Sequence, residues 1–152
     1  MAISKFKSAI IIFLIFLLDQ ITKYFIVKNF YLGESVPVIE NVFHITYITN
    51  TGTAFGMLQK YGNILLAFSV VAIILISILV FKQKTNSITH PLALSLILGG
   101  AFGNLVDRIF RGEIIDFLDF RVWPIFNIAD SAITVGIIVL FYHYLFSKKI
   151  SK

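Results

Sequence analysis

Four long apolar runs constrain this chain more than any other feature of its sequence. They cover about residues 8–27, 62–81, 91–110 and 127–146. Each run is close to the ~20 residues that an α-helix needs to cross ~30 Å of hydrocarbon. Because a backbone in lipid must satisfy its own hydrogen bonds, we expect an all-α polytopic membrane protein with four transmembrane helices.

The composition agrees with a membrane protein and excludes several functions. Apolar residues make up 58% of the chain and charged residues 14%, against about 45–50% and about 25% in soluble domains. The net charge of +5 does not indicate a nucleic-acid partner, because the basic residues flank the apolar runs and form no stripe. The chain has no cysteine, which excludes disulfides, thiolate nucleophiles and cysteine zinc sites. We expect a single integral membrane domain over residues 1–152.

The connections between the runs predict a small folded region outside the membrane. Residues 28–61 form a long connection, and Val42 to Thr49 within it is rich in β-branched and aromatic residues. This composition predicts a strand in a small extracytoplasmic β-sheet and loop region. Residues 82–90 form a short polar turn, and residues 109–125 form a second outer connection.

The lysines predict which end of the spans faces the cytoplasm. They cluster before the first run, between the second and third runs, and after the fourth run, as Lys5, Lys7, Lys82, Lys84, Lys148, Lys149 and Lys152. If the four spans alternate in direction, these clusters share one side, which the positive-inside rule makes cytoplasmic. Both termini are then cytoplasmic.

Polar side chains gather at the opposite, outer end of the spans. Five stretches far apart in sequence contribute them, as Asp19, Gln20 and Lys23, then Asn50, then Asn104, Asp107 and Arg108, then Asp116, and finally Asn127 with Asp130. Acidic groups at membrane depth cost about 2.5–3.5 kcal/mol each on insertion scales, so they are usually retained for a function. This convergence predicts a functional site at the outer membrane face.

Asp116 and Asp130 are the candidate catalytic pair. Two neighbouring carboxylates cannot both ionise cheaply, so they share a proton over a broad pH range. One can then take a proton from water while the other donates to a carbonyl oxygen, which hydrolyses a peptide without metal or covalent intermediate. Asn127 suits a helix N-cap and Asp130 the first turn, where negative charge is favoured, so Asp130 is the candidate base. Asp119, close to Arg121, is interpreted as a solvated loop carboxylate.

Two further pairs each admit two interpretations. Asp19 and Lys23 lie four residues apart on one helical face. They either form an ion pair that eases burial or line the pocket and hold a substrate backbone. Asp107 could tie down loops, while Arg108 could bind a carbonyl oxygen or a lipid phosphate.

The remaining patterns indicate packing more than chemistry. Gly99 and Gly103 have the Gly-x-x-x-Gly spacing of closely packed membrane helices. His44, His90 and His143 are dispersed and form no His-Glu-x-x-His pattern, so a metalloprotease has little support. No serine lies in a nucleophile-elbow pattern. We expect neither a metal nor a cofactor.

Five short sequence blocks, spread along the chain from residue 19 to residue 130, carry a family resemblance. They are Asp19–Lys23, Asn50–Gly56, Gly103–Arg108, Gly112–Phe117 and Phe126–Asp130. In this order they resemble the motifs of lipoprotein signal peptidase, also called signal peptidase II. The resemblance implies a bacterial inner-membrane aspartyl endopeptidase. Such an enzyme removes the signal peptide from diacylglyceryl-modified prolipoproteins, cleaving just before the lipidated cysteine.

The resemblance also implies roles for individual residues. Asp116 and Asp130 would form the catalytic dyad. The implied substrate-binding set is Asn50, Asn104, Arg108 and Asn127, together with Asp19 and Lys23, which support the pocket, while Asp107 and Gly103 support the structure. The family is inhibited by the cyclic peptide globomycin, so sensitivity to globomycin-like inhibitors is implied. Membrane lipids are expected partners, and the chain is expected to work as a monomer.

Two rival functions stay open on the sequence alone. A small proton- or ion-coupled transporter would place polar groups near the midplane with access from both sides. The inner halves of the spans offer little beyond Ser77, Ser95 and His143. A structural subunit would not need two acid–asparagine clusters at one depth.

Overall fold

Four long helices make up most of the structure, a computed structural model that describes residues 4–51, 62–82 and 87–147. They are α1 (Lys5–Asn29), α2 (Gly62–Lys82), α3 (Thr89–Arg111) and α4 (Ile128–Ser147). All four are long and apolar enough to cross a membrane, which confirms the predicted spans to within a few residues. Lys84 and the C-terminal lysines, which contribute to the predicted orientation, lie outside the described residues.

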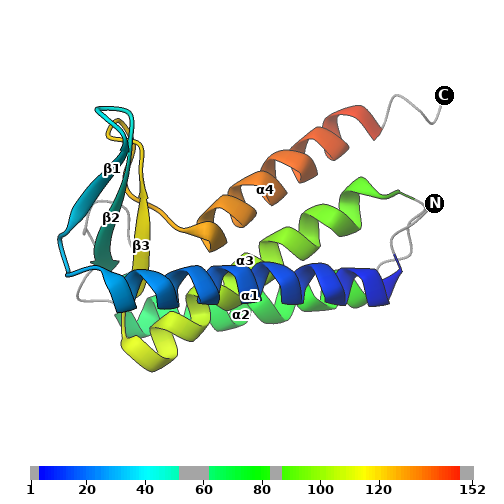
Figure 1. Cartoon of the computed structure of the whole chain (residues 1–152). Helices are drawn as coiled ribbons and strands as arrows, with labels where there is room; N and C mark the ends of the chain where they lie inside the picture. The colour runs from blue at the N-terminus through cyan, green and yellow to red at the C-terminus, as the bar shows by residue number, and fades with distance from the viewer. Residues whose placement is uncertain (1–3, 52–61, 83–86, 148–152) are drawn as a thin grey trace.

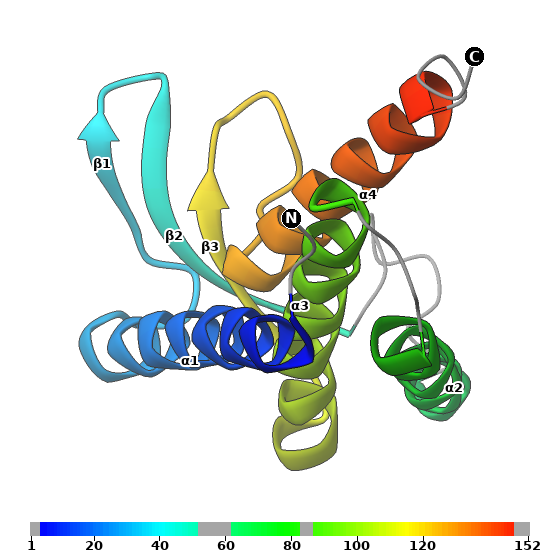
Figure 2. The same ribbon diagram turned by 90° about the vertical axis from the view of Figure 1, so that its right-hand side faces the viewer.

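The helices alternate in direction around a central α3. α1 begins and α4 ends at the end of the bundle opposite the sheet (Figure 1), as expected for alternating spans. α3 packs against α1, α2 and α4 (Figure 2). In α3, 56% of the most apolar stretch is buried, against 11–17% in the other three helices. α3 is therefore the core of the bundle, and the other helices present apolar surface to lipid.

Local sequence sets the ends of two helices. The Ser4 hydroxyl caps α1 by accepting a hydrogen bond from the backbone N–H of Lys7 at 3.3 Å. α3 begins at Thr89, slightly before the predicted start, because a helix tolerates Pro91 in its first turn. α3 ends at Arg111, and Gly112 follows as its C-cap with a φ of 80°, a left-handed conformation that glycine adopts without steric cost.

A three-stranded antiparallel sheet stands at one end of the bundle (Figure 1). Its strands are β1 (Ser35–Ile39), β2 (Phe43–Asn50) and β3 (Ile114–Asp119), in the order β1-β2-β3. β2 confirms the strand predicted over residues 42–49. The sequence does not predict β1 or β3. It places Asp116 in the outer connection over residues 109–125 as a loop residue, which is wrong, because Asp116 lies on β3 opposite Ile48.

Glycines on α3 let α1 and α4 approach its backbone closely. A Cβ atom at Gly100 would collide with the carbonyl oxygen of Ala129 in α4. A Cβ atom at Gly103 would collide with the Asp19 carboxylate of α1. The close packing predicted from the spacing of Gly99 and Gly103 is confirmed, and it brings polar groups of three helices together.

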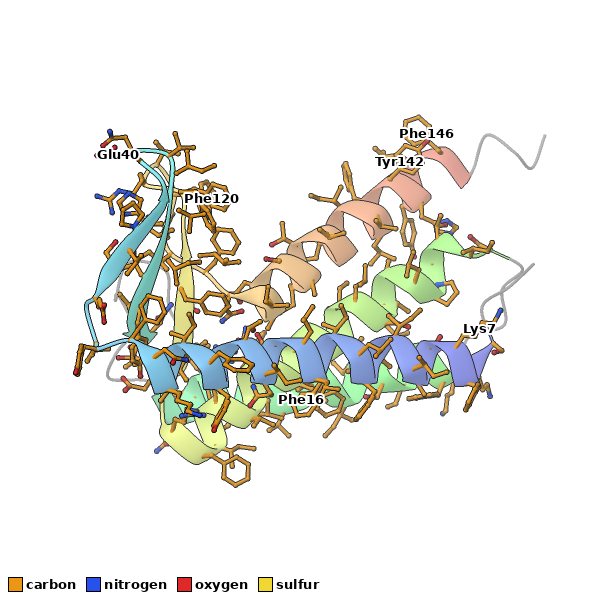
Figure 3. The ribbon with its side chains drawn as sticks, in the orientation of Figure 1. Lys7, Phe16, Glu40, Phe120, Tyr142 and Phe146 are labelled. Carbon is orange, nitrogen blue, oxygen red and sulfur yellow. The ribbon has the colours of Figure 1, made fainter. Side chains whose placement is uncertain are left out.

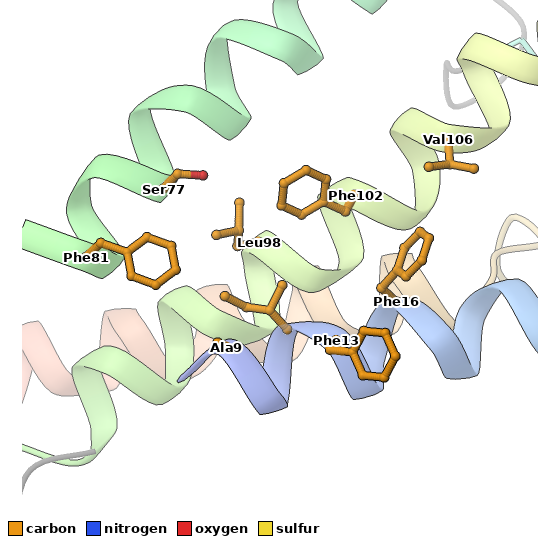
Figure 4. Close-up of a pocket in the computed structure, with 9 residues that line it drawn as sticks. Ala9, Phe13, Phe16, Ser77, Phe81, Leu98, Phe102 and Val106 are labelled. Carbon is orange, nitrogen blue, oxygen red and sulfur yellow. The ribbon is translucent and has the colours of Figure 1, made fainter. Parts of the chain in front are cut away.

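A groove of about 360 Å³ opens between α1, α2 and α3 (Figure 4). Apolar side chains dominate its lining, which consists of Ala9, Ile12, Phe13, Phe16, Ser77, Phe81, Leu98, Phe102 and Val106. Leu98, Phe102 and Val106 recur every four positions of α3, on the opposite face from Asn104 and Arg108. This apolar groove is therefore separate from the polar residues of α3.

Gly100→Ala is expected to lower the free energy of unfolding by about 1–3 kcal/mol, because the added methyl group forces α4 away from α3. Thermal unfolding in detergent, followed by circular dichroism, measures the loss. Ala67→Val is the matched control, since it adds carbon atoms at an exposed position of α2 and should leave the melting temperature unchanged. Equal melting temperatures for the two variants would contradict the close α3–α4 contact.

Candidate active site

A buried ion network ties α1 to α3 beneath the sheet. The Lys23 ammonium lies 2.8 Å from Asp19 Oδ2 and 2.7 Å from Asp107 Oδ2. It also donates to Asn104 Oδ1 at 3.1 Å. The Lys23, Asp19 and Asp107 side chains are all 0% exposed. A buried charge is very costly unless it is paired and hydrogen-bonded, and here the three donors of the ammonium have three oxygen acceptors.

Asp19 extends this network to α4. Its Oδ1 accepts a hydrogen bond at 2.9 Å from the backbone N–H of Ala129, in the first turn of α4, where N–H groups lack helical partners. Gln20 donates to the Asp19 carboxylate and to the carbonyl oxygen of Gly103, both at 3.2 Å. Of the two interpretations of Asp19 and Lys23, the structure shows the ion pair. Neither side chain is among the described residues that line the cleft, so this placement favours a supporting role.

Two asparagines connect the two aspartates of the predicted dyad, and a third binds Asp116. Asn127 donates to Asp116 Oδ1, and Asn104 donates to Asp130 Oδ1, each at 2.7 Å. Asn127 also donates to the Asn104 oxygen at 3.1 Å, which links the two amides. Asn50, at the end of β2, donates to Asp116 Oδ2 at 3.0 Å. The rest of its sequence block, residues 52–56, lies outside the described residues.

The surroundings fix the orientation of both linking amides. The Asn104 oxygen accepts from Lys23 and Asn127, so its NH₂ group is the part that faces Asp130. The Asn127 oxygen accepts from the backbone N–H of Asp130 at 2.8 Å, so its NH₂ group faces Asp116. This bond also confirms the predicted N-cap of α4. The buried lysine therefore acts on Asp130 through Asn104.

Asp107 ties β3 to α3 and thereby positions Asp116. Its Oδ2 accepts a hydrogen bond from the backbone N–H of Ile115 at 3.3 Å, and its Oδ1 lies 3.6 Å from Arg111 Nε. The interpretation that Asp107 ties down an outer connection holds, although the connection is a strand. Asp116 follows Ile115 directly. Its position is therefore set both by the ion network, through Asp107, and by the pairing of β3 in the sheet.

Burial and a neighbouring carboxylate change the ionisation of Asp116. The residue is 1% exposed. Its burial, together with the negative charge of Asp130, raises the pKa of Asp116 to about 7. The amides of Asn50 and Asn127 and the charge of Lys23 oppose this shift. Asp116 therefore holds a proton in a large share of molecules at neutral pH, as acid catalysis requires.

A cleft of about 790 Å³ opens beside the two aspartates. Its polar lining is Asn50, Asn104, Arg108, Asp116, Asp130, Ser131 and Thr134. Its apolar lining is Ile114, Phe120, Trp123, Pro124, Ile125, Phe126 and Val135. Three of the asparagine and arginine residues predicted to contact substrate thus line the cleft, while Asn127 is fully buried and holds Asp116. Apolar walls with a few convergent polar groups are typical of ligand sites.

Arg108 connects the cleft to α2. Its Nη1 donates to Ser69 Oγ at 3.2 Å, and Ser69 donates to the Leu65 carbonyl oxygen of its own helix at 2.7 Å. Within the part of the chain that the structure describes, the Arg108 Nε is buried and has no hydrogen-bond partner. Arg108 itself lines the cleft, so the guanidinium N–H groups that reach the cleft, rather than the buried Nε, can donate to a bound carbonyl or phosphate oxygen. The contact to Ser69 is not predicted from the sequence, because serines in apolar helices commonly bond only to their own backbone.

Asp119 is not the solvated loop carboxylate that its sequence context predicts. It ends β3, is 4% exposed, and accepts hydrogen bonds from the Thr46 hydroxyl and the Arg121 backbone N–H, both at 2.8 Å. Burial alone would raise the pKa of Asp119, but these hydrogen bonds and the Arg121 guanidinium lower it. Asp119 is not among the described residues that line the cleft, so it is a poorer candidate than Asp116 for the catalytic partner of Asp130.

The histidines stay dispersed in the fold. His44 lies on β2, whereas the rings of His90 and His143 lie 5.5 Å apart at the ends of α3 and α4 remote from the sheet. Within residues 4–51, 62–82 and 87–147, no three His, Cys, Asp or Glu side chains come close enough to hold a metal ion.

The fold and the cleft define a class of protein, a four-helix membrane enzyme with a small sheet at one end. Two solved structures described as bacterial membrane enzymes, determined by the in meso method, share this architecture. The structure at 2.3 Å resolution superposes with a TM-score of 0.88 and 32% identity, over 95% of this chain and 91% of that chain. The structure at 1.9 Å resolution has a TM-score of 0.83 and 33% identity, over 91% and 92%.

The sequence comparisons define the family. The family model of signal peptidase (SPase) II matches residues 11–146. A lipoprotein signal peptidase of Brevibacillus brevis is 48% identical over 125 residues, which cover 81% of this chain and 84% of that protein. The relative of the same name from Bacillus pumilus is 44% identical over 149 residues, which cover 94% and 95%. The chain belongs to the signal peptidase II family, a family of peptidases. This confirms the resemblance and gives the transporter no support.

Lys23→Met is expected to cost about 3–5 kcal/mol of stability, because it leaves two buried carboxylates without their cation. Thermal unfolding in detergent measures the loss. Lys28→Met, at an exposed position five residues further along α1, is the matched control and should have little effect. Adding Asp107→Asn to Lys23→Met should recover part of the loss. If Lys23→Met and Lys28→Met unfold at the same temperature, the ion network does not stabilise the fold.

Proposed function

We propose that this chain is a membrane aspartyl endopeptidase that removes the signal peptide from diacylglyceryl-modified prolipoproteins, just before the lipidated cysteine. Membership of the signal peptidase II family supports the substrate class. The aspartyl mechanism rests on one observation, the hydrogen-bonded path from Asp116 through Asn127 and Asn104 to Asp130. Both aspartates line a single cleft, so both can act on one peptide bond.

Asp116 and Asp130 divide the acid and base roles in this mechanism. Asp130, at the positive N-terminal end of α4, takes a proton from the water that attacks the carbonyl carbon. Asp116, whose pKa of about 7 keeps a proton on a large share of molecules at neutral pH, donates this proton to the carbonyl oxygen. When the tetrahedral intermediate collapses, the C–N bond breaks, Asp130 gives its proton to the leaving amine, and Asp116 takes back a proton from the hydroxyl group that becomes the carbonyl oxygen. The dyad then returns to its starting state with one shared proton.

The other polar residues position the dyad and the substrate. Asn127 and Asn104 each bind one oxygen of an aspartate, which leaves further lone pairs of both carboxyls for water and substrate. Arg108 lines the cleft, and its guanidinium offers N–H donors to a peptide carbonyl. Asn50 holds the second oxygen of Asp116 from the opposite strand. Asp19, Lys23 and Asp107 do not touch substrate in this proposal.

The membrane placement follows from the substrate. A diacylated precursor stays in the bilayer, so a cleft at the outer end of the spans must open sideways to lipid. We assign both termini to the cytoplasm and the sheet with its cleft to the outer face. Membrane lipids and globomycin-like cyclic peptides are the other expected ligands. The chain acts as a monomer, since one copy supplies both aspartates and the cleft.

Asp116→Asn and Asp130→Asn are each expected to reduce cleavage of a lipidated precursor at least ~10²-fold, because each removes one of the proton-transfer groups. Cleavage by the reconstituted protein is followed by mass spectrometry of the released signal peptide. Glu113→Gln is the matched control, because Glu113 is a partly exposed acid three residues from Asp116 that does not line the cleft. It should cleave like the parent protein. Normal cleavage by both Asp→Asn variants would remove the aspartyl mechanism.

The pH dependence of kcat/KM tests the assignment of Asp116 as the acid. Activity should fall as the pH rises through about 7, because Asp116 then loses its proton. Asn50→Ala removes a hydrogen bond that lowers the pKa of Asp116, so the pKa rises further and the alkaline limb moves to higher pH. The pH at which this limb falls is compared between the parent protein and Asn50→Ala. The absolute rates are not compared, because they also depend on contacts with the substrate. A limb that moves to lower pH contradicts the assignment.

A further inference from the structure

A short turn after β3 presents two large apolar side chains at the rim of the cleft. Val122 is 93% exposed and Trp123 is 69% exposed. Trp123 is the single tryptophan of the chain and also lines the cleft. Adjacent exposed apolar side chains of this size commonly mark an interaction surface.

The turn is held in a strained conformation. Arg121 has a φ of 65°, which side chains rarely adopt, and the Val122 N–H donates to the Phe120 carbonyl oxygen at 2.7 Å. Together these features form a γ-turn of the rare, strained type. Asp119 fastens the turn by accepting from the Arg121 backbone N–H at 2.8 Å and from its guanidinium at 3.0 Å, while Thr46 holds the same carboxylate. Such strain persists only where the surroundings enforce it, and it is frequent at functional sites.

The turn lies at the overhanging end of the sheet. The strands run across the direction of the helices, and in both views the end of the sheet with the turn projects away from α1 (Figures 1 and 2). Phe120 lies on the side of the sheet that faces the helices (Figure 3). Its ring centroid is 5.8 Å from that of Phe126 and 4.8 Å from that of Phe43. The side that faces the membrane is therefore aromatic.

These positions favour the lipid interface as the partner of the turn. Trp123 precedes Ile128, the first residue of a membrane-spanning helix, by five residues, so the chain between them extends at most about 17 Å. Tryptophan is enriched at this depth, because its apolar ring and its polar N–H suit the boundary between hydrocarbon and headgroups. The half-exposed Arg121 guanidinium keeps donors beyond its bond to Asp119, and these suit a lipid phosphate.

We propose that Val122 and Trp123 insert into the headgroup region of the outer leaflet and form a fixed lipid-contacting lip beside the active-site cleft. The lip holds the mouth of the cleft against the bilayer, so a lipid-anchored substrate reaches the aspartates without leaving the membrane. This inference rests on the outer-face placement in the proposed function and is independent of the aspartyl chemistry.

The single tryptophan allows a direct test. The full chain is reconstituted without substrate in phosphatidylcholine vesicles whose bromine atoms lie either near the glycerol backbone or near the chain ends. The emission of Trp123 should be blue-shifted relative to free tryptophan and quenched more strongly by the shallow bromines than by the deep ones. Emission typical of water with no quenching by either lipid would overturn the proposal. Quenching that appears only after a lipidated precursor is added would also overturn it, and would assign the turn to the substrate.

Asp119→Asn tests whether the hydrogen bonds between Asp119 and Arg121 hold the lip at a fixed depth. The variant weakens the contacts to Arg121, so the shallow quenching should fall by about twofold as the turn loses its fixed depth. Glu40→Gln is the matched control, because it removes an exposed acid between β1 and β2 and should leave the quenching unchanged. Quenching in Asp119→Asn equal to that in Glu40→Gln would overturn the fastening role. The same fall in quenching from Asp119→Asn, about twofold, is expected when the protein also carries Asp116→Asn, the variant expected to lose cleavage of substrate. Failure of the lip and failure of the peptidase mechanism are therefore distinguishable.

Discussion

The buried ammonium of Lys23 is the interaction on which the rest of the site depends. It neutralises Asp19 and Asp107, and these two carboxylates in turn bind backbone N–H groups of α4 and β3. The same ammonium turns the amide of Asn104 toward Asp130. One cation therefore joins three helices and a strand and sets the position of a candidate catalytic group, although it does not line the cleft itself.

A buried ion network is not a strong source of stability, because desolvation offsets much of the attraction between the charges. Its value here is specificity of arrangement. Apolar side chains pack helices together in lipid without fixing their rotation about their axes, whereas Lys23, Asp19 and Asp107 satisfy one another in one geometry only. The small residues of α3 make that geometry possible, since a side chain at Gly103 would occupy the space of the Asp19 carboxylate.

Features that depend on local sequence are predictable, and features that depend on distant partners are not. The spans, the packing at Gly103 and the cap at Asn127 follow from apolar length, residue size and short-range hydrogen bonds. The strand β3 does not, because its sequence mixes acids with apolar residues and its pairing is set by β2, far away in the chain. Asp119 is misjudged for the same reason, since its buried partner Thr46 lies 73 positions away. The convergence of Asp116 and Asp130 is predictable because alternating spans bring both to one membrane face.

The central claim is that Asp116 and Asp130 share a proton beside the cleft, and infrared spectroscopy tests it most directly. A protonated carboxyl band that Asp116→Asn abolishes should titrate near pH 7 in the parent protein. In Asp130→Asn the same band should titrate at lower pH, because the negative charge that opposes ionisation is gone. A parent protein whose carboxyl bands all titrate in the range of free aspartate, with no response to Asp130→Asn, would show that the two groups do not interact and would contradict the account.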